Sequence, residues 1–420
     1  MYIITTTTQV YDGWTNWTIS EFTLWGVMDF PLFFLPSAYL LSRSLRYSVV
    51  AGTACMFVGS VLRCLPLLFP SVGHFTLLCH LGGFINAIGG PIAMAAPIQI
   101  SAAWFPPNER TRATSISQMF NALGVGVSNL LGTLVVREVH WDDTNEDNND
   151  VDIKTIQNDI EVLLYVYAGV STLIFILVLF YFPSEPPSPP SNSASEDRLG
   201  FLKGLKNLVM NRNAWPVTIT YAMSQGLVQM WQTSMVINLT SMDIGVSETW
   251  ASTLSTVISF SAVGVSIIIA TFMDYFRKKM KLAIIILLCS SGLIFIFCTL
   301  ITESIITISE VSQFKTLLYL LLVTGVSLAC GCAPITFEFC AELCYPVAEG
   351  TIGTWLCVWF NNISVIYFTV FGIEERFQLG LGTRWLNYVL PCSVLLPLPL
   401  LLLVQEDYKR SQLDDTLVDA

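Results

Sequence analysis

The chain has 420 residues, of which 53% are hydrophobic and only 12% are charged. Soluble domains carry about 25% charged residues, so this composition excludes an ordinary cytosolic enzyme, and it excludes disorder because disorder needs low hydrophobicity and high charge. The net charge of −11 comes largely from the acidic residues within 137–161, and the lack of a long basic run in the sequence argues against nucleic acid as a partner.

Apolar segments of about 20 residues, the length that crosses the roughly 30 Å hydrocarbon core of a bilayer, recur along the whole chain. The sequence therefore predicts an all-α, multi-pass integral membrane protein with eleven transmembrane helices. In chain order we expect them at Phe22–Leu41, Tyr47–Phe69, Phe75–Ile98, Ala113–Val136, Val162–Phe182, Ala214–Asn238, Trp250–Phe272, Leu282–Ile301, Lys315–Cys340, Gly353–Gly372 and Leu386–Val404.

The loops on the two sides of the membrane differ in charge, and this difference predicts the orientation. Fourteen of the twenty Lys and Arg residues, among them Arg43 and Arg46, lie in one set of loops and five in the other. We expect the first set in the cytosol, together with the C-terminus. The sequons at Asn16 and Asn238 fall on the predicted outer side, so both are candidate glycosylation sites.

Two loops repeat one pattern at an offset of 240 residues. Residues 105–114 read Phe-Pro-Pro-Asn-Glu-Arg-Thr-Arg-Ala-Thr, and residues 345–354 read Tyr-Pro-Val-Ala-Glu-Gly-Thr-Ile-Gly-Thr. Duplicated halves joined by a basic linker are typical of secondary transporters. We therefore expect an N-terminal bundle at 1–182, a cytosolic linker at 183–213, a C-terminal bundle at 214–404 and a cytosolic tail at 405–420.

The same offset predicts that the first half is incomplete. Moving the expected helix Ala214–Asn238 back by about 240 residues places it before Met1. The first half then has five helices where the second has six, so the first helix of the N-terminal half is missing. A truncated gene start and a genuine eleven-helix variant would both produce this pattern.

The segment at residues 334–351 carries the most specific motif. It reads Pro-Ile-Thr-Phe-Glu-Phe-Cys-Ala-Glu-Leu-Cys-Tyr-Pro-Val-Ala-Glu-Gly-Thr, which is similar to a Phe-Glu-x-x-x-Glu-x-x-Tyr-Pro-x-x-Glu-Gly signature. That signature belongs to the solute carrier 49 group, the feline leukaemia virus subgroup C receptor-related transporters of the major facilitator superfamily. Further matching runs are Leu62–Pro66, Gly90-Pro91, Ala96-Pro97, Trp104-Phe105 and Met273–Arg277.

The resemblance implies a fold of two six-helix bundles and transport of a small solute. It is strongest to the lysosomal, proton-driven pyridoxine (vitamin B6) carriers of the group, whose other members carry choline-like or haem-related cargo. The chain departs from the group in its first basic loop, where Leu41 and Ser44 replace Asp and Gly, although the second copy keeps Asp274 and Arg277. The lysosomal carriers have a dileucine sorting signal near the N-terminus, and this sequence shows no equivalent extension, so the plasma membrane is the alternative location.

Polar side chains within apolar helices mark the candidate solute site, which should lie at mid-membrane between the halves. Gln118 and Asn121 share one face of their helix, and Gln229 lies in the first helix of the second half. The resemblance places an aromatic residue of the cargo site at Trp231 and an amide at Asn361. A planar ring with hydroxyls would suit stacking and amide hydrogen bonds, and a quaternary ammonium would also suit the aromatic ring.

Two carboxylates are candidates for proton coupling, because an ionisable group inside a membrane helix is costly and often functional. Glu338 lies near the inner end of its helix, where burial could keep it partly protonated, and Asp29 lies eight residues into the first helix. The alternative for Glu338 is a structural ion pair with Arg110 or Arg112.

The other charged residues at helix–loop junctions have expected gating or structural roles, because a carboxylate before a helix N-terminus is stabilised by free N–H groups. They are Arg43, Arg46, Glu109, Arg110, Asp274, Arg277, Glu342 and Glu349.

These features together predict a secondary transporter and not an enzyme. We expect a monomer that moves a small polar or cationic organic solute, most similar to pyridoxine, across a lipid bilayer by alternating access with proton coupling. Three histidines, and eleven cysteines within or beside apolar spans, predict no metal and no cofactor. The alternatives are a choline- or haem-related carrier and a membrane receptor or scaffold that does not transport.

Overall fold

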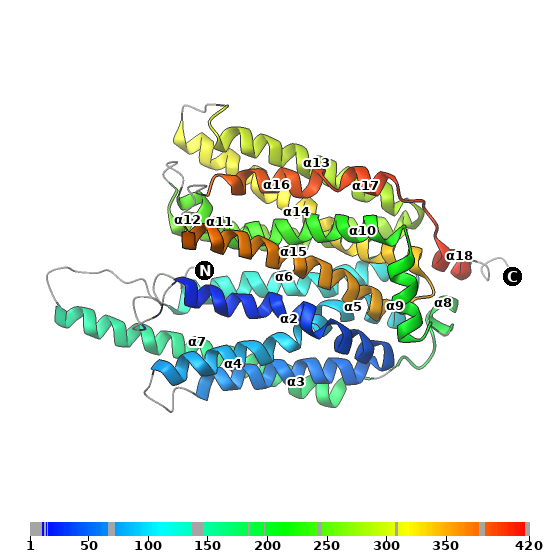
Figure 1. Cartoon of the computed structure of the whole chain (residues 1–420), viewed down its shortest axis with the longest axis horizontal. Coiled ribbons are helices and arrows are strands. Elements are labelled where there is room, and N and C mark those ends of the chain that lie inside the picture. The colour runs from blue at the N-terminus through cyan, green and yellow to red at the C-terminus, as the bar shows by residue number, and fades with distance from the viewer. Residues whose placement is uncertain are drawn as a thin grey trace.

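The computed structural model describes residues 11, 14, 16–65, 72–136, 146–183, 185–196, 198–241, 246–306, 310–377 and 383–415. All regular secondary structure in these residues is helical (Figure 1). The elements are α2 (Asn16–Arg43), α3 (Leu45–Cys64), α4 (Val72–Ile88), α5 (Gly90–Trp104), α6 (Arg110–Val135), α7 (Glu146–Tyr181), α8 (Asn192–Ser195), α9 (Phe201–Met210), α10 (Ala214–Tyr221), η2 (Ala222–Leu227), α11 (Val228–Thr240), α12 (Glu248–Tyr275), η3 (Arg277–Lys279), α13 (Met280–Thr302), α14 (Val311–Cys344), α15 (Glu349–Phe377), α16 (Trp385–Leu395), α17 (Leu398–Leu402) and α18 (Lys409–Asp415).

Each of the eleven expected transmembrane helices has a counterpart among these elements, so the predicted all-α membrane fold is confirmed. Three of them are interrupted. Gly89 and Pro91 divide the third into α4 and α5, a π-helical turn (η2) divides the sixth, and Pro397 precedes the short α17. A proline lacks the N–H that a continuous helix needs, and π turns are frequent at functional sites.

Eight of the helical segments that the structure describes are long and apolar enough to cross a membrane. The three expected spans outside this group are α2, α6 and the α10–η2–α11 segment. The last two carry the polar side chains of the central cavity, which lowers their mean hydropathy. By contrast, the lipid-exposed α7 has large apolar side chains such as Leu173 and Phe180 on its surface.

The two halves pack through two equivalent joints. The most extensive contacts between the halves join α6 to α12 and α2 to α15. At the offset of the sequence repeat, α2 corresponds to α12 and α6 corresponds to α15, so a two-fold exchange of the halves converts one joint into the other. Among the described residues, the α10–η2–α11 segment has no counterpart in the first half.

The two copies of one dipeptide show the effect of this difference. Phe120-Asn121 on α6 corresponds to Phe360-Asn361 on α15, again 240 residues later. Phe360 and Asn361 are each 4% exposed because α15 packs against η2, whereas Phe120 is 66% exposed. The face of α6 that carries Phe120 and Asn121 is therefore more open than the equivalent face of α15.

The short elements α8, α9 and α18 lie together at one end of the bundle (Figure 1). This end also carries the loops rich in Lys and Arg, and we call it the basic end. The linker reaches α15 there through α9, and α18 contacts both α8 and α14. The basic end is therefore where the linker, the tail and the two halves meet.

Candidate functional site

A cavity of about 310 Å³ lies between the two halves. Ligand pockets of about 300–1,000 Å³ are typical for small molecules, so this volume suits a small solute. Side chains from α5, α6, α10–η2–α11, α12, α14 and α15 line it. The described residues of its lining include no charged side chain; the polar ones are Ser117, Gln118, Asn121, Tyr221, Gln225, Gln229, Gln232, Thr233, Ser252, Ser255 and Ser259.

The first half contributes two amides from one face of α6. Gln118 and Asn121, which the sequence singled out, both line the cavity. The Oε1 atom of Gln118 is buried and accepts no hydrogen bond from the described residues. A buried acceptor without a donor is costly, so this oxygen is suited to accept a hydrogen bond from a bound solute.

The second half contributes a row of amides spaced along one helical face. Gln229 is exposed to the cavity, Gln225 donates to the carbonyl of Ala329 (2.8 Å), and Gln232 donates to Ser259 Oγ (3.1 Å). The hydroxyls of Ser252, Ser255 and Ser259 on α12 also line the cavity. Sequence reasoning missed these three serines, although their spacing of three and four residues is the signal of one helical face.

The aromatic wall of the cavity consists of Tyr221, Phe337 and Phe360. The rings of Tyr221 and Phe337 are 5.0 Å apart at an interplanar angle of 83°, a favourable edge-to-face arrangement. Trp231, the expected aromatic residue, does not line the cavity: its side chain is 2% exposed within the core of the second half. The placement expected for Trp231 is therefore wrong.

Asn361 is also outside the cavity lining. It is 4% exposed, and its Nδ2 atom donates to the carbonyl of Cys357 one turn earlier (2.8 Å). Its neighbour Phe360 reaches the cavity instead. Of the five residues expected to bind solute, Gln118, Asn121 and Gln229 share one cavity, and their role in binding stays a prediction.

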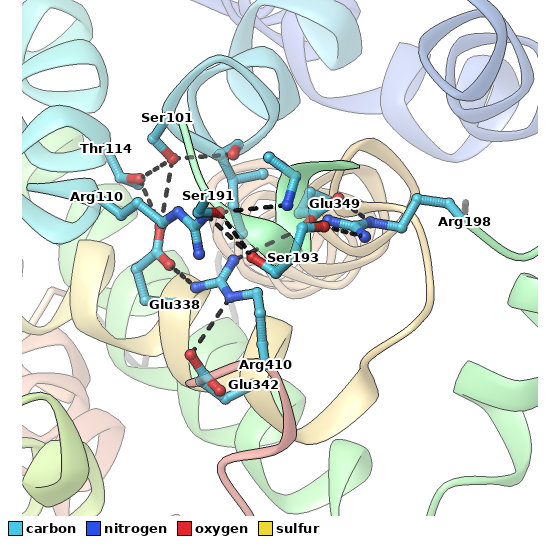
Figure 2. Close-up of polar contacts among 12 residues, drawn as sticks. Ser101, Arg110, Thr114, Ser191, Ser193, Arg198, Glu338, Glu342, Glu349 and Arg410 are labelled. Atoms are coloured by element: carbon cyan, nitrogen blue, oxygen red, sulfur yellow. Dashed lines mark hydrogen bonds and ion pairs between the residues drawn. The ribbon is translucent and has the colours of Figure 1, made fainter. Parts of the chain in front are cut away.

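Between the cavity and the basic end, Glu338 forms an ion pair, but with a partner that the sequence did not suggest. The hydroxyls of Thr114 and Ser101 donate to Glu338 Oε1 (2.7 and 3.4 Å), and Arg410 of α18 binds Oε2 (Figure 2). The expected partners were Arg110 and Arg112, whereas the observed partner comes from the tail. The side chain of Asp29, the other coupling candidate, lies outside the described residues.

Arg410 is surrounded by carboxylates. Its Nε lies 3.3 Å from Glu342 Oε1, and its Nη1 lies 3.9 Å from Glu349 Oε1. Burial by itself would lower the pKa of Arg410, but the charges of Glu338, Glu342 and Glu349 outweigh burial and raise it above its ordinary value. Arg410 is therefore a permanent cation at the centre of the basic end.

Two further ion pairs tie the linker and the tail to this cluster. Arg198 of the linker forms a bidentate pair with Glu349 (2.9 and 2.6 Å), which is a strong geometry for a guanidinium. Arg110 at the start of α6 donates to Asp414 of α18 (3.0 Å) and to Ser193 of α8 (3.0 Å). The side chains of Arg110 and Asp414 are each 4% exposed, so this pair is buried.

Asp274 joins the end of α12 to the start of α6. Its two carboxylate oxygens accept hydrogen bonds from the backbone N–H groups of Thr111 (3.0 Å) and Arg112 (3.1 Å). These N–H groups belong to the first turn of α6 and have no acceptor within their own helix. One side chain therefore caps a helix of the other half.

The remaining junction residues lie nearer the surface. Glu109 pairs with Arg112 at 3.1 Å, with both side chains about 40% exposed, so this contact contributes little. Arg43 stacks over the Tyr39 ring (5.4 Å), and Arg46 reaches the carbonyl of Leu179 (3.5 Å). The side chain of Arg277 lies outside the described residues.

The candidate glycosylation site at Asn238 is not accessible. Its side chain is fully buried, and its Nδ2 atom donates to Oδ1 of Asn387 (3.1 Å). A glycan on this nitrogen would have no room inside the helix bundle, so the prediction for Asn238 is wrong. The side chain of Asn16 lies outside the described residues.

Comparison with known proteins agrees with this geometry. The family model of the Major Facilitator Superfamily matches residues 14–371. The "Solute carrier family 49 member 4 homolog" of Xenopus tropicalis is 30% identical over 404 residues, which cover 94% of this chain and 84% of the relative. The "Choline/ethanolamine transporter FLVCR2" of Rattus norvegicus is 24% identical over 345 residues, 79% of this chain and 58% of that protein.

Solved structures show the same fold. The crystal structure of the transporter FucP in the outward conformation aligns with a TM-score of 0.68 at 14% identity, over 95% of this chain and 92% of that one. A bacterial homologue of the iron transporter ferroportin in an outward-facing state aligns with a TM-score of 0.62 at 11% identity, over 98% and 94% of the two chains.

Proposed function

The chain belongs to the major facilitator superfamily and, within it, to the solute carrier 49 family, and from this premise we propose that it is a secondary transporter of a small, neutral or weakly charged organic solute with ring and hydroxyl groups, as in pyridoxine. The solute binds in the cavity between the halves. The observation that carries this proposal is the unpaired Oε1 atom of Gln118 in a wall made of amides and hydroxyls.

The distribution of charge supports alternating access. The cavity extends along α12 as far as Ser252, one turn from the end of that helix opposite the basic end. At the basic end, Glu338, Arg410 and Asp274 hold α6, α12 and α14 together. We take the basic end as cytosolic, so the solute enters from the other side and leaves after these contacts separate.

The side chains that line the cavity favour a solute with an uncharged ring over a solute with a permanent positive charge. Gln118, Asn121 and Gln229 can hydrogen-bond to hydroxyl groups, and Tyr221 and Phe337 can pack against a ring. A quaternary ammonium would gain from the aromatic rings but cannot hydrogen-bond to the amides, and choline offers them a single hydroxyl. Choline is therefore the comparison substrate, since four relatives of this chain are named as choline/ethanolamine transporters.

Proton coupling is part of the proposal and depends on Glu338 or Asp29. Both oxygens of Glu338 have partners in this conformation, so the contact with Arg410 must break before this carboxylate becomes accessible. An acidic compartment such as the lysosome would supply the gradient. If a pH gradient leaves the uptake rate unchanged, the proposal of proton coupling is refuted, whereas the proposal of solute transport is not.

The experiment is uptake of labelled pyridoxine into vesicles that contain the purified protein, with choline in parallel. Gln118→Ala should weaken pyridoxine binding by about five- to tenfold, the effect of one hydrogen bond. Gln313→Ala is the matched control, because Gln313 is exposed near the start of α14. Uptake equal to that of empty vesicles, or an equal effect of the two substitutions, would refute the proposal.

A further inference from the structure

The seven-residue helix α18 makes polar contacts with both halves and with the linker. Its Arg410 binds Glu338 and Glu342 of α14, and the N–H and hydroxyl groups of Ser411 also bind Glu342 (2.9 and 2.8 Å). One turn later, Asp414 binds Arg110 of α6. One face of α18 therefore carries one group of contacts with the second half and another with the first half.

The linker strengthens the second group of contacts. The backbone N–H and the hydroxyl of Ser193 in α8 both donate to Asp414 (2.8 and 2.9 Å), and the same hydroxyl lies 3.0 Å from Arg110. The hydroxyl of Ser191 lies beside it and accepts from Arg110. The Asp414 side chain is 4% exposed, so Arg110 and the linker are its partners in place of water.

These contacts are of a kind that can form and break. The helix α18 contains only one apolar residue, Leu413, and residues 404–408 before it are not helical. Charged contacts can be exchanged for contacts with water when the two halves separate, whereas an apolar face would favour permanent burial. Tyr408, directly before α18, is buried in the core of the second half and packs against Phe339 of α14, so the helix stays with the second half while its contact with Arg110 can break.

We propose that α18 is a detachable clamp that holds the basic end of the transporter closed. Its second-half contacts, at Arg410 and Ser411, keep it on α14. Its first-half contact, between Asp414 and Arg110, breaks in every cycle when α6 moves away from α14. The clamp stabilises the closed state and thereby sets how often the cavity opens to the basic end.

The proposal rests on alternating access, but a test that needs no solute can measure it. Ser101 is 1% exposed and lies beside Thr114 and Glu338, so a cysteine there becomes reactive only when the basic end opens. The probe is a membrane-impermeant maleimide applied from the basic end to the full-length Ser101→Cys protein in vesicles. The same protein with Ser101 intact corrects for the natural cysteines.

Reversing the charge of Asp414 should open the clamp. Asp414→Arg places a cation against Arg110, and the labelling rate at position 101 should rise by about 100-fold, as expected when a buried ion pair is broken. Combining it with Arg110→Asp restores opposite charges and should return most of the protection. The control is Asp407→Arg, because Asp407 forms only a surface pair with Lys409 (3.4 Å; 44% exposed).

A second pair of variants covers the case in which charge reversal prevents folding. Asp414→Asn keeps the shape of the side chain and removes the charge that binds Arg110, and Asp407→Asn is its matched control. Labelling at position 101 should rise by about tenfold in Asp414→Asn and stay unchanged in Asp407→Asn. Equal labelling rates for the two members of either pair would overturn the clamp. Protection at position 101 without any solute uptake would instead count against the proposed transport function.

Discussion

Asp274 offers the clearest measurement of how strongly the two halves are held together at the basic end. Its carboxylate accepts from two backbone N–H groups of α6 while its own helix, α12, belongs to the other half. When α6 separates from α12, both hydrogen bonds are lost together. Asp274 therefore stabilises only the state in which the basic end is closed. Its removal should shift the equilibrium towards the state in which this end is open.

The size of the shift follows from the contacts. A hydrogen bond to a charged group contributes about 1.5–3 kcal/mol, and the lower value applied twice gives about 3 kcal/mol, or about 100-fold in the equilibrium. Asp274→Ala removes both hydrogen bonds and should therefore lose the whole of this stabilisation. Asp274→Asn keeps one carbonyl acceptor but loses the charge that the N-terminus of α6 favours, so its effect should be intermediate.

A cross-link close to this joint reports the effect. The hydroxyls of Ser115 on α6 and Ser266 on α12 are 3.2 Å apart, and both side chains are fully buried. Cysteines at these two positions should form a disulfide rapidly in the closed state, and Asp274→Ala should slow it by reducing the closed population. Asp407→Ala is the matched control. A disulfide rate in Asp274→Ala within twofold of that in the parent would refute the reasoning.

Three further predictions concern packing and accessibility. Gly353→Ala should destabilise the fold by about 1–3 kcal/mol, because the added Cβ would lie 2.8 Å from Ile98 and 2.9 Å from the carbonyl of Ala95, whereas Gly124→Ala meets nothing within 4 Å; thermal unfolding of both variants compares them. Trp231→Phe should leave solute affinity within about twofold, as judged by equilibrium binding, because Trp231 is outside the cavity lining. Asn238→Gln should leave electrophoretic mobility unchanged in protein from a glycosylating host, because Asn238 is buried, and a shift would contradict the packing described.

The helices were predictable because exposure to lipid makes each span apolar, which is a local property of the sequence. The repeat at residues 105–114 and 345–354 likewise predicted two duplicated halves, although not the joints through which they pack. The cavity was predictable in part, since polar side chains such as Gln118 and Gln229 inside a span need a polar surface to face. Trp231 was misplaced because residues two apart point to opposite sides of a helix, so Trp231 cannot share a face with Gln229.

The ion pairs at the basic end could not be derived in the same way. Glu338 and Arg410 are separated by 72 residues in sequence, and the path of the tail back across the bundle is set by tertiary packing. Arg110 and Arg112 were as plausible as partners, because periodicity says nothing about which distant charge arrives at a given carboxylate. The burial of Asn238 also depends on a neighbour, Asn387, that lies 149 residues away.

The departure from symmetry at the first basic loop now has a physical explanation. At the α6–α12 joint, Asp274 caps a helix with its carboxylate. At the equivalent α2–α15 joint, Leu41 packs against Gly350, where an added Cβ would lie 2.9 Å from the Leu41 Cβ, and the Leu41 carbonyl accepts from Gln99 (2.9 Å). An aspartate is not needed there, because the equivalent N–H groups of Thr351 and Ile352 both donate to the carbonyl of Ala348 (2.9 and 3.1 Å).

The two joints should therefore respond differently when the basic end opens. The contacts at Asp274, like those of the clamp at Asp414, are made of charges that water can solvate once they separate. The contact at Leu41 and Gly350 is close packing that involves no ion pair, with the Gln99 amide as its polar neighbour, and its separation would leave a void or expose apolar surface. We therefore expect the α6–α12 side, with α18 beside it, to separate more readily than the α2–α15 side.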